Sequence, residues 1–139
     1  MGGFGALHVG FNNPDLFIAV TGNSPCCVTT DAPPADGAFS NVYGNDKDYF
    51  MAMAPTTLAA KNVAKIKQQS VRIICGTKDA LFAGAQWTHE QLTTLGIQHE
   101  WRPVPESPHN HDQLLQYEAF DTMAFYGKVF GKSSARSTN

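Results

Sequence analysis

The segment that most constrains the fold is the nearly continuous apolar run at residues 71–75, VRIIC. Such a run is typical of a strand that is buried on both faces of a parallel sheet. A turn at residues 76–79 follows it, and residues 84–95 have the spacing of an amphipathic helix that Gly96 ends. Residues 99–104, HEWRPV, predict the next strand. Strands that alternate with helices in this way predict crossover connections and a mostly parallel sheet.

The flanking segments extend the same α/β pattern in both directions. We expect a helix at residues 5–11, which ends before Asn-Asn-Pro, and a strand at residues 16–20, LFIAV. Residues 26–49 are rich in Gly, Pro, Asp and Asn, which indicates an irregular excursion from the sheet. A last helix is expected at residues 113–130, and the tail at residues 131–139 lacks apolar anchors and is expected to be disordered.

The predicted sheet is small for the fold class that its pattern indicates. Three strands make a poor parallel sheet, and 139 residues are few for a complete α/β enzyme. We therefore expect residues 1–130 to be part of a larger α/β domain, with an incomplete, mostly parallel sheet flanked by helices.

Composition argues against several classes of function. The formal net charge is −2 and the chain has no stripe of Lys and Arg, so neither nucleic acid nor an anionic membrane surface is the expected partner. No apolar stretch approaches the roughly 20 residues that span a bilayer. Among the 3 cysteines, Cys26 and Cys27 are adjacent and Cys75 lies in the apolar run, so we expect no disulfide framework and a buried Cys75. These features do not determine the compartment.

The first residues carry the most specific motif. Residues 1–7, MGGFGAL, match the second half of the strained turn that presents the nucleophilic serine in α/β-hydrolases. In the esterase branch that includes the feruloyl esterases, this turn commonly reads G-x-S-M-G-G-[FY]-G-A, and the Asn-Pro-Asp-Leu-Phe that follows the helix also matches. The chain thus resembles the C-terminal part of an α/β-hydrolase serine esterase, starting just after the serine. The resemblance implies that the backbone N–H of Met1 belongs to the oxyanion hole.

A second motif follows the buried strand at residues 71–75. The sequence Gly-Thr-Lys-Asp places Asp79 at the carboxyl edge of the sheet, where α/β enzymes carry their sites. The resemblance implies that Asp79 is the acid of the catalytic triad, which orients a histidine ring. The alternative is that Asp79 only caps the helix that comes next.

A third motif, VPESPHNHD at residues 104–112, supplies two candidate bases. Both keep the chain order of serine, acid and histidine. In the feruloyl-esterase branch the loop often reads V-P-x-x-x-H-N, which selects His109, whereas a Gly-His-Asp loop in a competing branch selects His111. The resemblance therefore implies His109 as the base, with His111 as the alternate. The His-x-His-Asp sequence also resembles half of a metal site, but without a second ligand cluster we predict no metal.

The three motifs together imply a carboxylic-ester hydrolase, or an acyltransferase of the same fold, that acts on a small-molecule ester through an acyl-enzyme without a cofactor. No other serine lies in the context of a nucleophile turn, so we expect this chain to be truncated and inactive by itself. A missing N-terminal half, or a separate chain, would supply the serine. The competing hypothesis is a non-catalytic remnant whose uncovered sheet edge pairs with a second copy or another partner.

Overall fold

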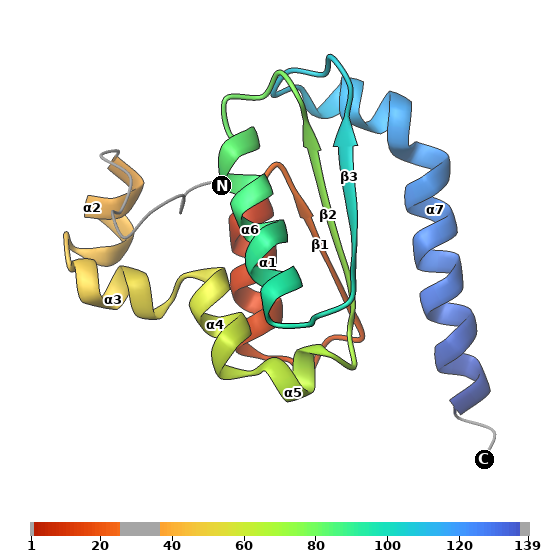
Figure 1. The fold of residues 1–139 in the computed structure, drawn as a ribbon, viewed down its shortest axis with the longest axis horizontal. Helices are drawn as coiled ribbons and strands as arrows, with labels where there is room; N and C mark the ends of the chain where they lie inside the picture. Colours follow the sequence, from red (N-terminus) through yellow and green to blue (C-terminus); the bar gives the residue numbers. More distant parts are fainter. Residues whose placement is uncertain (1, 26–36, 137–139) are drawn as a thin grey trace.

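A three-stranded parallel sheet forms the centre of the molecule, in the order β1-β2-β3 (Figure 1). The computed structural model describes residues 2–25 and 37–136. The strands are β1 (Ala19–Asn23), β2 (Ser70–Gly76) and β3 (His99–Val104). Because the strands are parallel, their carboxyl ends meet at one edge of the sheet, and the polar loops that follow them begin there.

Helices connect the strands and cover both faces of the sheet. They are α1 (Gly2–Asn12), α2 (Gly37–Tyr43), α3 (Lys47–Ala52), α4 (Pro55–Lys61), α5 (Val63–Ile66), α6 (Phe82–Thr94) and α7 (His111–Arg136). Helices α1, α4 and α6 share the main core with one face, and α7 covers the other (Figure 1). Within the described residues, β1 and β3 each have a free edge. The predicted α/β class, with an open parallel sheet between helices, is confirmed.

Side chains of β2 alternate between the two helical layers. Val71, Ile73 and Cys75 lie in the main core with α1, α4 and α6, whereas Ile74 packs on the other face against Leu114 of α7. Every residue from 71 to 76 is buried, which is why this strand reads as a continuous apolar run. The burial of Cys75 as a free thiol agrees with the expectation from sequence.

The apolar run contains one charged residue, Arg72, which is completely buried beneath α7. Its guanidinium donates to Glu118 and Thr122, each at 2.8 Å, and its Nε lies 3.3 Å from Glu100. The guanidinium carbon also lies 5.7 Å from the ring centre of Phe125. A buried charge is tolerated only when it is paired, so these contacts attach α7 to the middle of the sheet.

The first strand lies later in the chain than its hydropathy predicts. Residues 16–20 were expected to form it, but Leu16 and Ile18 are 76% and 51% exposed and precede β1. The backbone decides the position, because Ser70 N–H donates to the Ile18 carbonyl at 2.9 Å and pairing then continues from Ala19. A short apolar run indicates a strand but not its register.

Two further boundaries differ from the sequence-based expectation. Residues 37–49 of the supposed irregular region contain α2 and the start of α3, and Asp46 caps α3 by accepting the Tyr49 N–H at 2.8 Å. Residues 26–36 lie outside the described residues. Helix α7 continues to Arg136 rather than ending at residue 130, so part of the predicted tail is helical.

Candidate active site

Asp79 and His109 lie together at the carboxyl edge of the sheet. Asp79 follows β2 in a turn, and His109 lies in the loop between β3 and α7. The Nδ1–H of His109 donates to Oδ2 of Asp79 at 2.8 Å, although the two residues are 30 positions apart. The Asp79 side chain is fully buried, whereas that of His109 is 61% exposed. The carboxylate is thus held by the protein while the outer edge of the imidazole faces solvent.

Backbone contacts between the two loops set this geometry. Gly76, the last residue of β2, approaches the Ser107 carbonyl so closely that a Cβ would lie 2.1 Å from that oxygen. The same carbonyl accepts the Lys78 N–H at 3.0 Å, and the Glu106 N–H donates to the Thr77 hydroxyl at 2.9 Å. Only glycine allows such an approach, so Gly76 determines how near the histidine loop comes to Asp79.

Hydrogen bonds keep the Asp79 carboxyl ionised despite its burial. Burial by itself raises a carboxyl pKa, but hydrogen bonds from the Leu81 N–H and His109 help to outweigh it, and the pKa lies below its usual value. The Leu81 N–H reaches Oδ1 at 2.8 Å. Asp79 therefore bonds the start of the next helix and the histidine at once, so the capping alternative and the site role are compatible.

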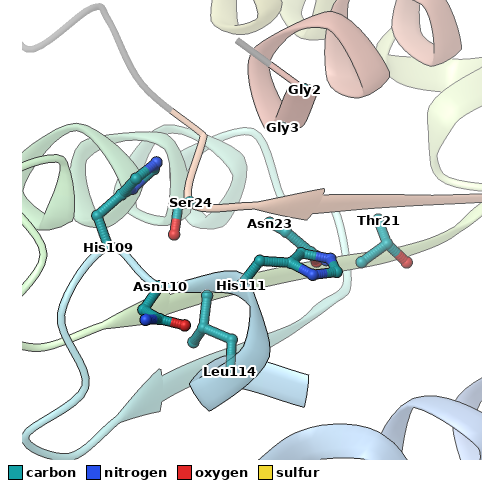
Figure 2. Close-up of a pocket in the computed structure, with 9 residues that line it drawn as sticks. All are labelled: Gly2, Gly3, Thr21, Asn23, Ser24, His109, Asn110, His111 and Leu114. Atoms are coloured by element: carbon teal, nitrogen blue, oxygen red, sulfur yellow. The ribbon is translucent and has the colours of Figure 1, made fainter.

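His111, the other candidate base, has a different position. It is the first residue of α7, whose N-terminus is capped by Asn110 through a bond from the Gln113 N–H at 3.1 Å. Its Nδ1 lies 4.0 Å from the exposed Asp112 rather than near Asp79. Figure 2 shows the rings of His109 and His111 pointing in different directions from the same loop. The geometry favours His109 as the partner of Asp79.

A cavity of about 320 Å³ lies between these histidines and the N-terminal end of α1. Gly2 and Gly3 line it from the helix (Figure 2). A Cβ on Gly3 would lie 2.1 Å from the Asn23 carbonyl oxygen, so a glycine is needed where α1 meets the end of β1. Free N–H groups and the helix dipole make such a terminus suitable for developing negative charge. Met1, the predicted oxyanion-hole residue, lies outside the described residues.

Polar residues at the end of β1 complete the cavity and were not selected from the sequence. Thr21, Asn23 and Ser24 line it together with Asn110. The one feature that could have identified these residues is their position at the end of a strand. The ends of parallel strands meet at the edge of the sheet where α/β proteins carry their sites. Which of these polar side chains face the cavity depends on the register of β1. The sequence-based prediction placed this strand too early in the chain.

The remaining histidines lie away from this site. Nδ1 of His89 and Nε2 of His99 are hydrogen-bonded at 2.7 Å beside the ring of Trp101. Nδ1 of His8 lies 2.8 Å from the Met53 carbonyl oxygen. In the described part of the chain, no group of three or more His, Cys, Asp or Glu side chains is arranged to hold a metal ion. None of the described helices is both long and apolar enough to cross a bilayer.

An open parallel sheet with a buried acid after one strand and a histidine after the next is the arrangement of an α/β-hydrolase-type protein. The family model described as "Putative esterase" matches residues 1–129. The chain belongs to this esterase family.

Solved structures share the fold at low sequence identity. The S-formylglutathione hydrolase FrmB from Staphylococcus aureus superposes with a TM-score of 0.67 at 21% identity, and the alignment covers 93% of this chain and 51% of that one. FphF, a fluorophosphonate-binding serine hydrolase from Staphylococcus aureus, gives a TM-score of 0.68 at 20% identity, with coverages of 92% and 51%. A ferulic acid esterase gives a TM-score of 0.64 at 19% identity, with coverages of 94% and 48%. The chain thus spans about half the length of each.

Proposed function

We propose that this chain is the part of a serine carboxylic-ester hydrolase that supplies the acid and the base, Asp79 and His109. The observation that carries the proposal is the 2.8 Å bond from His109 Nδ1–H to the buried, ionised Asp79. Membership of the esterase family and the position at the carboxyl edge of the sheet support the same assignment.

The geometry assigns a separate task to each nitrogen of His109. Donation from Nδ1–H to Asp79 leaves the Nε2 lone pair free to take a proton from a serine hydroxyl as that oxygen attacks the ester carbonyl. The protonated ring then gives this proton to the leaving alcohol, and water later hydrolyses the acyl-enzyme by the same route. Asp79 stabilises the charged ring throughout. The N-terminal end of α1 would stabilise the oxyanion, with the Met1 N–H as the proposed donor.

The proposed nucleophile is a serine directly before Met1 in a longer polypeptide. The motif at residues 1–7 supports this placement. Ser24 is an unsuitable substitute, because it is 5% exposed and its hydroxyl points away from the His109 ring in Figure 2. We therefore propose that the 139 residues alone hydrolyse esters negligibly.

The test compares this chain with the polypeptide encoded by the same reading frame extended upstream of Met1. On a small activated ester such as p-nitrophenyl acetate, we expect turnover only from the extended protein. Substitution His109→Ala in that protein should lower kcat at least roughly a thousandfold, since triad residues act as a unit. His111→Ala is the matched control and should leave kcat within a few-fold of the parent.

Three results would contradict the proposal. Turnover by the 139-residue chain that His109→Ala abolishes would show that a nucleophile lies within it. Equal damage from His111→Ala would overturn the assignment of the base. A stop codon immediately upstream of Met1 would remove the longer polypeptide.

A second candidate function, self-association through β1, has a specific observation in its favour. A groove of about 420 Å³ is lined by residues of α1 and β1, by Phe17 and by Tyr126 of α7. Strand edges and exposed apolar residues such as the neighbouring Leu16 favour pairing. We propose that the isolated chain dimerises there. Light scattering after gel filtration should show a dimer that Phe17→Lys dissociates, and a monomer at micromolar concentration would contradict it.

A further inference from the structure

Asn110, the residue directly after His109, makes hydrogen bonds on both sides of its position in the chain. Its backbone N–H donates to the Pro108 carbonyl at 2.8 Å, and its own carbonyl accepts the Leu114 N–H at 3.0 Å. Its side-chain Oδ1 accepts the Gln113 N–H at 3.1 Å. Asn110 therefore joins the histidine loop to the first turn of α7.

The bond between Asn110 and Pro108 closes a three-residue turn around His109. A bond from the N–H of one residue to the carbonyl two positions earlier is that of a γ-turn, and His109 is its central residue. The proline on one side has a fixed φ. The direction in which the His109 side chain leaves this turn therefore depends on how firmly Asn110 is held on the other side.

The side chain of Asn110 is the N-cap of α7, which begins at His111. The oxygen of a capping residue accepts an N–H of the first turn that has no partner inside the helix. Asparagine and serine cap about equally well, whereas alanine cannot cap. Without the cap, the first turn of α7 would fray and Asn110 would lose its fixed position beside His109.

Helix α7 is itself attached to β2, the strand that leads to the acid. Leu114 in its first turn is buried against Ile74 of β2. One turn later, Glu118 accepts a hydrogen bond at 2.8 Å from the completely buried Arg72 of the same strand. The cap therefore connects the histidine loop, through α7, to the strand that Asp79 follows.

We infer that Asn110 is a positioning residue. By capping α7, its side chain keeps the turn around His109 in the orientation that brings Nδ1 to Asp79 at 2.8 Å. The functional meaning of this inference rests on the proposed hydrolase mechanism. The structural claim concerns only which nitrogen of His109 carries the proton, so it can be tested without any activity. Asn110 also lines the cavity, and the test is therefore made without substrate.

The test measures the ratio of the two neutral tautomers of His109 by nitrogen NMR of the full chain, at a mildly alkaline pH where histidine rings are neutral. The bond to Asp79 selects the Nδ1–H form. Asn110→Ala removes the cap but keeps the backbone N–H that closes the turn. We expect the ratio of the Nδ1–H to the Nε2–H form to fall roughly fivefold, the equilibrium factor that corresponds to one helix cap. Asn110→Ser keeps a capping oxygen and should restore the parent ratio.

A second cap of the same kind separates positioning from general destabilisation. Asp46 caps α3 by accepting the Tyr49 N–H at 2.8 Å, and neither residue lines the cavity. Asp46→Ala should therefore lower stability as Asn110→Ala does, but leave the tautomer ratio of His109 unchanged.

Three results would overturn the inference. They are an unchanged ratio in Asn110→Ala, an equal fall in Asp46→Ala, and a fall in Asn110→Ser as large as that in Asn110→Ala. A failure of the extended protein to hydrolyse esters would refute the proposed function but would leave these ratios as expected.

Discussion

The contact between Gly76 and the histidine loop gives the most direct test of how the fold builds the site. A methyl group at position 76 would lie 2.1 Å from the backbone oxygen of Ser107, whereas real Cβ contacts are not shorter than 3.0 Å. In Gly76→Ala the loop must therefore retreat by about 1 Å. Neither partner in the clash is a flexible side-chain end, so the strain cannot be relieved by a change of rotamer.

The retreat has two calculable consequences. If the loop moves as a unit, the bond from His109 to Asp79 lengthens from 2.8 Å to about 3.7 Å, beyond hydrogen-bonding distance. Overpacking costs about 1–3 kcal/mol of unfolding free energy. The buried carboxylate also loses a donor, which costs a further 1–3 kcal/mol, roughly. We expect Gly76→Ala to lose about 2–6 kcal/mol in total.

Urea denaturation followed by circular dichroism measures the loss of stability, and the imidazole resonances of His109 report the broken bond. Gly127→Ala is the matched control, because a Cβ at that position in α7 meets nothing within 4 Å. Alanine should stabilise the helix there by up to about 1 kcal/mol. If Gly76→Ala were as stable as the parent and kept the His109 Nδ1–H bonded, the reasoning that Gly76 sets the loop position would be refuted.

Two further predictions concern charged groups away from the cavity. Glu118→Gln should lower the unfolding free energy by about 3 kcal/mol in urea titrations, because Arg72 is completely buried and would lose a charged partner at 2.8 Å; an effect below about 1 kcal/mol would show that Glu100 suffices. Burial and the neighbouring His99 lower the pKa of His89 below its usual 6.5. The unfolded chain therefore binds the proton first as the pH falls below 6.5, so stability should decline with acidification until His89 itself titrates. His89→Gln should reduce that decline in thermal melts across this range, and an identical pH dependence in the variant would contradict the assignment.

Much of the fold is readable from local sequence. The apolar run at residues 71–75 predicts a buried parallel strand, which the structure contains as β2. Strand β3 has the predicted bounds, His99–Val104. Pro55 begins α4, which suits proline because the first residue of a helix needs no backbone N–H for an intrahelical hydrogen bond. These features follow from hydropathy and backbone chemistry, which act within a few residues. The same local logic misplaced β1, because its register depends on the bond between Ser70 and Ile18.

The candidate site likewise has some features that local sequence predicts and others that depend on long-range contacts. The sequence alone indicated the order of the motifs, Asp79 as the candidate acid and two candidate histidines, because glycine turns and strand ends have local signatures. The sequence favoured His109 over His111 only by a motif, whereas the tertiary structure joins His109 to Asp79 by a bond across 30 residues, which a glycine makes possible by letting two loops touch. The tertiary structure also gave the buried Arg72 its partners. The partners of Asp79 and Arg72 depend on contacts between residues far apart in the chain and on burial away from water. Neither can be predicted from the residues next to them in the sequence.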